Sequence, residues 1–212
     1  MTIRNLWRLL LYAGLAYFIY LLLLITLQYI PIRTDVAFLR IKQEEIQLGY
    51  YRVAFFAHVF TSIVIISLGM TQFSTWFRRR YVGLHRIMGK WYVGLILLMS
   101  GPSGMIMSFH ANGGLIAQVS FIILTALWMW TTWIALRSAQ KGQYNRHRNF
   151  MIRSYALTLS AVSLRLFKFI IANTMELPPM DTYRIVAILG WTINLIVAEL
   201  IIYRLNSKSE RS

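Results

Sequence analysis

The stretch WFRRRYVGLHRIMGKWY, residues 76–92, sets five cationic side chains between two long apolar runs. Lys and Arg are retained on the cytoplasmic side when membrane helices insert, so a basic turn of this kind predicts a cytoplasmic connection between two transmembrane helices. This assignment fixes the expected side of every other connection in the chain. The cations of the turn are Arg78, Arg79, Arg80, Arg86 and Lys90.

Composition points to the same class of protein. Apolar residues make up 58% of the 212 residues, and charged residues only 14%. Apolar runs of about 20 residues recur, and each can cross a hydrocarbon core roughly 30 Å thick. The sequence therefore predicts an all-α integral membrane protein, with the lipid bilayer as its first partner. The net charge of +15 lies at the ends of these runs, which indicates topology and argues against a nucleic-acid partner. Cysteine is absent, which excludes disulfides and thiolate metal sites.

We expect six transmembrane helices in one helical domain, residues 1–212, with both termini in the cytoplasm. Fifteen of the 22 Lys and Arg residues then fall on the cytoplasmic side. Spans two to five are expected to form a four-helix core. The segment Gly101-Pro102-Ser103-Gly104 predicts a kink in the third span, because proline removes a backbone donor. The expected spans cover residues 6–29, 51–77, 86–109, 115–136, 149–173 and 183–203.

Four histidines lie in or beside these spans, two toward each face of the membrane. His58 and His110 lie toward the external face, and His85 and His147 lie at the cytoplasmic face. Two pairs on opposite sides of a four-helix core are what two b-type haems require, because each iron takes one imidazole from each of two helices. The pattern predicts a transmembrane electron carrier.

The motif Leu84-His85-Arg-Ile-Met-Gly89 resembles the His-x-x-x-Gly opening of the third helix in cytochrome b561-type proteins. This resemblance implies a membrane oxidoreductase with two haem b groups as cofactors. It implies His58 and His110 as ligands of the external haem iron, and His85 and His147 as ligands of the internal one.

A longer pattern resembles a bacterial membrane family catalogued as domain of unknown function 2306. It combines the first basic turn, the Gly-Pro-Ser-Gly segment and the sequence HRNFMIRSYAL at residues 147–157. The resemblance covers residues 50–170. It implies a multi-pass protein of the bacterial inner membrane and specifies no activity.

Two cations, Arg165 and Lys168, lie within the fifth expected span, three positions apart and therefore on one helix face. Charges at this depth need an anionic partner, and haem propionates, a quinone head group or an anionic substrate would each serve. Lys168 is also placed to extend its ammonium to the interface. The two cations leave open a cofactor-free transporter of small anions. A third alternative is a structural or assembly protein whose basic turns bind anionic lipid.

One acidic residue, Glu199, lies inside an expected span, about five residues from the inner end of the sixth. Arg153 lies at the same depth in the fifth span. Equal depth predicts an interhelical ion pair between them. Tyr155, Ser160 and Ser163 are expected to add interhelical hydrogen bonds, worth roughly 1 kcal/mol each.

Overall fold

The computed structural model describes residues 3–209, which form helices and connecting turns with no strand among them. Five helical segments are long and apolar enough to cross a bilayer, and α7 with α8 makes a sixth if this bent pair is one span. The expectation of an all-helical membrane protein is confirmed. The elements are α1 (Ile3–Leu27), η1 (Ala37–Ile41), η2 (Glu45–Gln47), α2 (Gly49–Gln72), α3 (Thr75–Arg80), α4 (Val82–Leu95), η3 (Ile96–Ser100), α5 (Gly101–Phe109), α6 (Leu115–Gln140), α7 (Tyr144–Thr158), α8 (Ser160–Thr174) and α9 (Pro179–Ser209).

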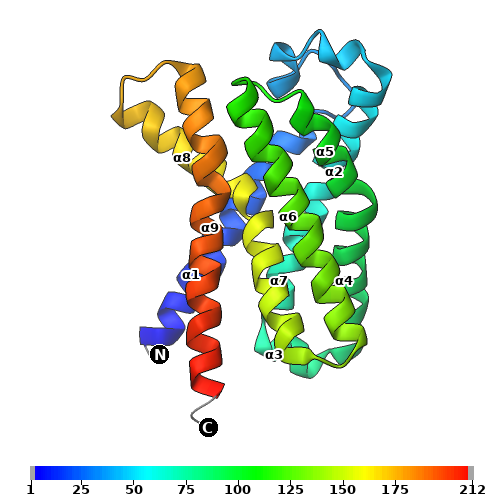
Figure 1. Ribbon diagram of the computed structural model, residues 1–212, viewed down its shortest axis with the longest axis vertical. Coiled ribbons are helices and arrows are strands. Elements are labelled where there is room, and N and C mark those ends of the chain that lie inside the picture. The colour runs from blue at the N-terminus through cyan, green and yellow to red at the C-terminus, as the bar shows by residue number, and fades with distance from the viewer. Residues whose placement is uncertain (1–2, 210–212) are drawn as a thin grey trace.

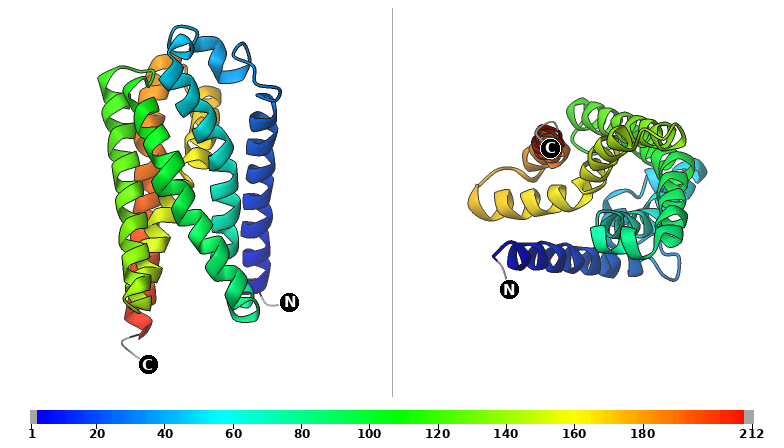
Figure 2. Two further views of the ribbon diagram at one scale, coloured as in Figure 1. Left: turned by 90° about the vertical axis from the view of Figure 1, so that its right-hand side faces the viewer. Right: turned by 90° about the horizontal axis from the view of Figure 1, so that it is seen from below.

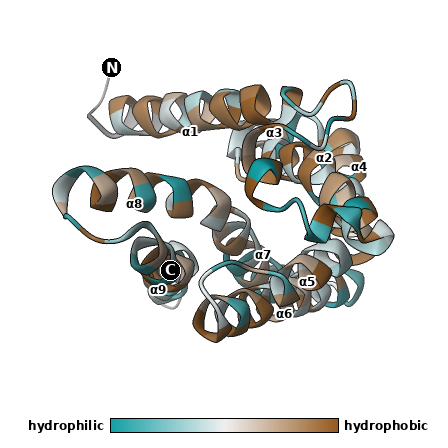
Figure 3. Cartoon of the chain, turned by 90° about the horizontal axis from the view of Figure 1, so that it is seen from above, coloured by the Kyte–Doolittle hydropathy of each residue, from teal (hydrophilic) through white to brown (hydrophobic). Residues whose placement is uncertain are grey.

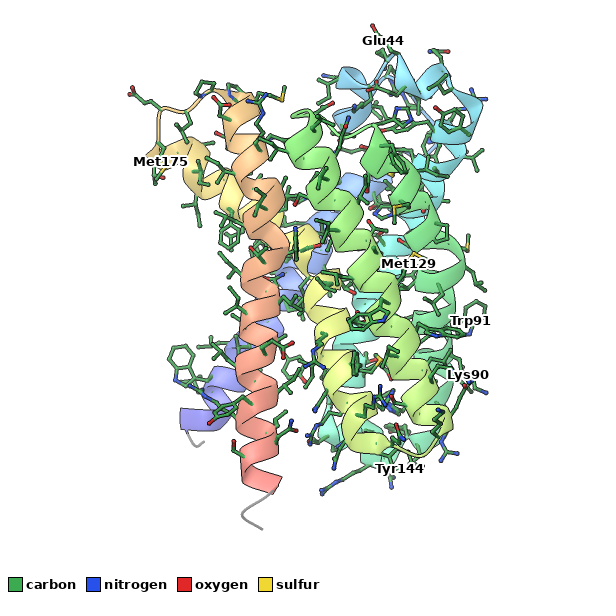
Figure 4. All side chains as sticks on the ribbon, viewed as in Figure 1. Glu44, Lys90, Trp91, Met129, Tyr144 and Met175 are labelled. Atoms are coloured by element: carbon green, nitrogen blue, oxygen red, sulfur yellow. The ribbon has the colours of Figure 1, made fainter. Side chains whose placement is uncertain are left out.

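The helices run between two distinct ends. α1 begins and α9 ends at the same end of the bundle as α3 and the α6–α7 turn (Figures 1 and 2). We call this the basic end, since α3 carries Arg78, Arg79 and Arg80. The opposite end holds η1, η2, the α5–α6 turn and the loop before α9. Figure 4 labels Tyr144 at the basic end and Glu44 at the opposite end. Which end faces the cytoplasm stays a prediction from the charge distribution.

The main buried core lies between α2, α4, α6 and α7, as expected for spans two to five. A hydrogen-bonded network runs through its centre. The hydroxyl of Tyr92 on α4 lies 3.0 Å from the Ser154 hydroxyl and 2.9 Å from the Thr158 hydroxyl, both on α7. Trp128 on α6 donates its indole N–H to Thr158 at 2.9 Å. All four side chains are buried, so these bonds join three helices where lipid or packed protein offers no other partner.

The third span contains a π-helical turn, η3, immediately before the Gly101-Pro102 pair. Proline cannot donate to the preceding turn, and a wider turn accommodates the missing bond. A Cβ added to Gly101 would lie 2.5 Å from the carbonyl oxygen of Ile96 and 2.7 Å from Cγ of Met129. Residues Val82–Phe109 nevertheless pass as a single membrane-length segment.

The fifth span is not the continuous helix expected over residues 149–173. It breaks at Leu159, where α7 and α8 meet at 41°. The side-chain amide of Asn194 on α9 donates to the carbonyl oxygen of Ala156 at 3.0 Å, which occupies an acceptor that a straight helix would offer to Ser160. A side chain inserted into the helical ladder is a recognised cause of a kink. As a result α7 stays in the core, whereas α8 leaves it and packs mainly on α9.

A polar cap covers the opposite end. Lys42, which follows η1, is 2% exposed, and its ammonium donates to the Glu45 carboxylate and to the backbone carbonyl of His110, each at 2.5 Å. Leu39 and Ile46 bury their side chains in a small apolar cluster with Tyr29, beneath the hydrogen bonds of Lys42. The loop between α1 and α2 is thereby fastened to the turn that follows α5.

Acid is expected to loosen this cap. Burial raises the pKa of Glu45, but the hydrogen bond from Lys42 and smaller attractive contributions outweigh it, so the net pKa lies below its usual value. A carboxyl whose pKa is depressed on folding stabilises the fold above its unfolded pKa, about 4.3, and loses that contribution as the pH falls through its folded value. The protection of amide hydrogens in residues 37–48, measured against their intrinsic exchange rates, should therefore fall below about pH 4. Glu45→Gln should show low protection at every pH, and equal pH profiles of protection for both proteins would contradict the assignment.

Candidate functional site

His85 and His147 occupy equivalent places at the basic end. Each lies in the first turn of its helix, α4 and α7, and both helices run away from that end (Figure 1). His85 precedes Tyr92 by seven residues, and His147 precedes Ser154 by seven. Seven residues are close to two helical turns, so each histidine lies on the same helix face as its partner, roughly 10 Å away. Tyr92 and Ser154 are hydrogen bonded to each other. His85 and His147 therefore lie at the same depth along the bundle, on the sides of α4 and α7 that face each other.

The tautomer of His147 is set by α6. Its Nδ1 lies 2.9 Å from the carbonyl oxygen of Ala135, which can only accept a hydrogen bond. Nδ1 therefore carries the proton, and Nε2 is left as the basic atom. A backbone carbonyl holding Nδ1–H is the usual support of a metal-binding histidine, since it fixes the ring orientation and raises the basicity of Nε2.

The His85 imidazole lacks the hydrogen bond that orients the His147 ring. Within residues 3–209, its Nδ1 is the buried side-chain polar atom for which the structure shows no hydrogen-bond partner. Its imidazole lies within electrostatic reach of His147, and of the guanidinium groups of Arg78 and Arg86. α4 and α7 both pack on α2 and α6 and make little contact with each other, so the two histidines lie diagonally across the core.

Two hollows at the basic end are lined by cations and by no histidine. One, of about 230 Å³, lies at the α6–α7 turn, and the other, of about 460 Å³, lies beside α3. They belong to the basic surface and lie outside the histidine pair. The cations that line them are Arg137, Lys141 and Arg146 in the first hollow, and Arg79 and Arg80 in the second.

His58 lies on α2 against the third span. Its Nδ1 is 2.9 Å from the carbonyl oxygen of Ser100, the last residue of the π-helical turn. The ring rests on Gly104, where an added Cβ would lie 3.0 Å from Cε1 of His58. As at His147, the carbonyl assigns the proton to Nδ1 and leaves Nε2 as an acceptor. The structure shows no hydrogen-bond partner for this Nε2 among the described residues, and the atom keeps some accessible surface.

The structure does not bring His58 and His110 together. His110 lies in the turn after α5, where its Nε2 is 3.2 Å from the Tyr50 hydroxyl and its ring meets the Tyr51 ring edge-on at 5.2 Å. Tyr51 and His58 are seven residues apart on α2, roughly 10 Å along the helix. Two imidazoles that share one metal ion must each approach it to roughly 2 Å. The arrangement shown cannot provide that for this pair.

Arg165 lies on α8, beyond the break in the fifth span. Its one hydrogen bond shown runs from Nη1 to the carbonyl oxygen of Ala161, at 2.7 Å. Lys168, one turn further along α8, is exposed and is shown in no ion pair within the described part of the chain. The break at Leu159 turns α8 away from the line of α7.

The predicted ion pair between Arg153 and Glu199 is confirmed, with nitrogen–oxygen distances of 2.6 and 2.8 Å. Tyr155 and Ser163 also bond between helices as expected, to the carbonyl of Ile66 and to Asn194. No interhelical bond of the Ser160 side chain is shown. These contacts hold α7, α8 and α9 in place around the site.

Comparison with known proteins supports the membrane assignment. The model of a family described as predicted membrane protein (DUF2306) matches residues 55–202, about two thirds of the chain, and this range contains all four histidines and Arg165. No curated protein and no solved structure matches the chain. None of these comparisons shows the resemblance to cytochrome b561-type proteins.

Proposed function

The chain belongs to the DUF2306 family of predicted membrane proteins, and we propose that it is a redox protein that holds one b-type haem between His85 and His147. This proposal reduces the two haems expected from the sequence to one. The observation that carries it is the placement of these two imidazoles, level with each other on facing sides of α4 and α7.

The donor set suits a haem at this place. His147 presents Nε2 with its ring already oriented by the Ala135 carbonyl. Arg78 and Arg86 lie near His85 and can pair with the two propionates of a haem. Gly89 lies one turn above His85 on the same face, and the side-chain oxygen of Gln72 lies 3.4 Å from the place that a Cβ of residue 89 would take. A bound haem supplies one-electron chemistry, while the chain supplies ligation, orientation and a medium of low dielectric constant.

The second histidine pair does not fit a haem, because His110 packs on Tyr51, which lies roughly 10 Å along α2 from His58. Electrons would therefore enter and leave at the basic end. The partner we propose there is a quinone or another small redox molecule. We propose that this end faces the cytoplasm and that the membrane is the bacterial inner membrane, since Lys and Arg are retained on the cytoplasmic side. Reporter fusions after Ser209, active only in the cytoplasm, test that orientation.

Visible spectroscopy tests the proposal directly. The protein is produced with added haem precursor, purified in detergent and measured oxidised and then reduced. We expect a sharp b-type band on reduction, lost in His85→Ala and in His147→Ala because each variant removes one axial ligand. His110→Ala is the matched control, since its ring bonds Tyr50 outside the proposed site, and it should keep the full band.

The outcomes separate the alternatives. A band that is halved in His58→Ala would restore the two-haem arrangement and overturn the single site. A colourless protein whose four histidines all tolerate substitution would reject haem binding and favour the structural or assembly role.

A further inference from the structure

The hollow at the α6–α7 turn gathers three cations and no acid. Its volume is about 230 Å³, and its lining comes from the end of α6, the turn and the start of α7. The cations are Arg137, Lys141 and Arg146. None of them takes part in an ion pair shown among residues 3–209. Cations that line one hollow repel one another, and an anion placed between them offsets that repulsion.

The described residues offer no free acid at the basic end. Glu199 is the acid of residues 3–209 that lies nearest this end, and it is already bonded to Arg153. The other acids of this range lie in the loop between α1 and α2 or around the start of α9, at the opposite end (Figure 1). They are Asp35, Glu44, Glu45, Glu176 and Asp181. An anion for the hollow therefore comes from outside this range.

The backbone of the turn that forms the hollow is fixed by two hydrogen bonds. Gln143 donates its N–H to the carbonyl oxygen of Ser138 at 2.9 Å, and Gly142 donates to that of Ala139 at 3.1 Å. Together they close the end of α6 in a Schellman motif, for which Gly142 supplies a φ of 69°. Lys141 and Gln143, which both line the hollow, are therefore held in one backbone conformation.

A buried hydroxyl lines the same hollow. The Ser138 side chain is 2% exposed, and no hydrogen bond of its hydroxyl is shown among the described residues. An oxygen anion in the hollow can accept the proton of this hydroxyl. The donors are then two guanidinium groups, one ammonium and one hydroxyl. This set suits a phosphate, because a guanidinium bonds two phosphate oxygens at once.

An exposed apolar stripe on α6 ends at the hollow. Its side chains recur at steps of three or four residues, so they lie on one face of the helix. α6 itself lies at the outer edge of the bundle (Figure 3). The last side chain of the stripe, Trp133, lines the hollow, and Cζ of Arg137 lies 5.8 Å from the centroid of its ring. The stripe consists of Ile116, Val119, Ile123, Ala126, Trp130 and Trp133.

We propose that this hollow binds the phosphate head group of an anionic phospholipid, whose tails lie along the α6 stripe. The hollow is at the end of a membrane-length helix, where tryptophans mark the boundary between lipid and water. Pockets that enclose whole small molecules measure roughly 300–1,000 Å³, so the smaller hollow suits a head group. The hollow beside α3 is lined by that short helix alone and lacks a buried hydroxyl. The lipid site does not depend on the proposed haem.

Native mass spectrometry of the detergent-purified chain tests the site, with phosphatidylglycerol as the anionic lipid and phosphatidylcholine of the same acyl chains as the neutral control. We expect phosphatidylglycerol to bind about tenfold more tightly, since the cations of the hollow repel the choline group. Inorganic phosphate should bind roughly tenfold more weakly than phosphatidylglycerol, because it lacks the tails. Equal binding of the two lipids would overturn the proposal. Equal binding of free phosphate would identify a water-soluble anion as the ligand and overturn the lipid assignment.

Variants locate the bound lipid. Arg137→Gln and Lys141→Gln should each weaken phosphatidylglycerol binding about fivefold, as expected for one cation near a membrane surface. Gln143→Trp leaves the charge unchanged at an exposed position of the turn and fills the hollow. It should weaken binding at least as strongly as Arg137→Gln. Elution as a single species in size-exclusion chromatography checks that each variant folds.

Arg204→Gln is the matched control. Arg204 is an exposed cation near the end of α9, at the basic end, and it lines neither hollow. Its replacement should change phosphatidylglycerol binding less than about twofold. Equal losses in Arg204→Gln and Arg137→Gln would show general attraction to basic residues and reject the site. Unchanged binding in Gln143→Trp would place the lipid outside the hollow and also reject it.

Discussion

Replacing Gly69 by alanine should lower the apparent melting temperature of the purified protein by roughly 6–12 °C, corresponding to about 3 kcal/mol. Gly69 on α2 lies directly against Tyr155 on α7. A Cβ at this position would lie 2.2 and 2.4 Å from two carbons of the Tyr155 ring, far inside van der Waals contact. Helices in membranes associate through such small-residue contacts, because lipid offers no hydrophobic force to bring them together.

Tyr155 cannot easily move aside. Its hydroxyl donates to the carbonyl oxygen of Ile66 at 3.1 Å, and its ring packs against Phe73 with centroids 5.2 Å apart. A methyl group on Gly69 must therefore push α2 and α7 apart. The damage would extend to the centre of the core, because Tyr92 lies 3.1 Å from the same added Cβ.

Gly94→Ala is the control for this prediction. Gly94 lies inside α4, and nothing surrounds its added Cβ within 4 Å. Alanine is favoured over glycine in helices by about 1 kcal/mol, so the melting temperature should stay constant or rise. In a Tyr155→Leu background, Gly69→Ala should have a much smaller effect. If the two glycine variants melt at the same temperature in the native background, the close approach of α2 and α7 is wrong.

The sequence predicted those parts of the structure that depend on local composition. Apolar length and the cations of α3 were enough to predict the long apolar helices, apart from the break in the fifth span, and to bring the start of α1 and the end of α9 to one end. The Arg153–Glu199 pair followed from equal depth alone, since an ionisable residue within a span requires a partner. The equal depth of His85 and His147 also follows from sequence spacing once Tyr92 and Ser154 are known to meet, because each histidine precedes one of these hydroxyl-bearing residues by seven positions.

The features of the structure that the sequence did not predict depend on contacts between residues far apart in the chain. The break at Leu159 has no proline or glycine to indicate it, and it arises where Asn194 of another helix occupies the Ala156 carbonyl. The position of Arg165 depends on that break, because a straight fifth span would carry Arg165 along the bundle with α7. His58 and His110 were paired by side of the membrane, but His110 packs on Tyr51, which helical rise places roughly 10 Å from His58 along α2.

The last prediction uses the ion pair between α7 and α9 to test the membrane setting itself. The side chains of Arg153 and Glu199 are 23% and 49% exposed, and pairs exposed to water contribute only about 0–1 kcal/mol. Glu199 lies eight residues before the end of its candidate span at Ser207, so we expect its exposed surface to face lipid. In that setting, removal of one partner leaves an uncompensated charge at a cost of about 3 kcal/mol. Glu199→Leu and Arg153→Leu should each lower the melting temperature by roughly 6–12 °C.

The double variant decides between the two settings. With both charges removed, the Arg153→Leu/Glu199→Leu protein should melt within about 4 °C of the native protein, because a pair of leucines is well solvated by lipid. The two effects are then strongly non-additive. Loss of the cation–π contact between Arg153 and Phe150, 4.8 Å from the ring centroid, should account for the remaining difference. Small, additive shifts in all three variants would show that this face of α7 and α9 lies in water, and the depth assigned to the pair would be wrong.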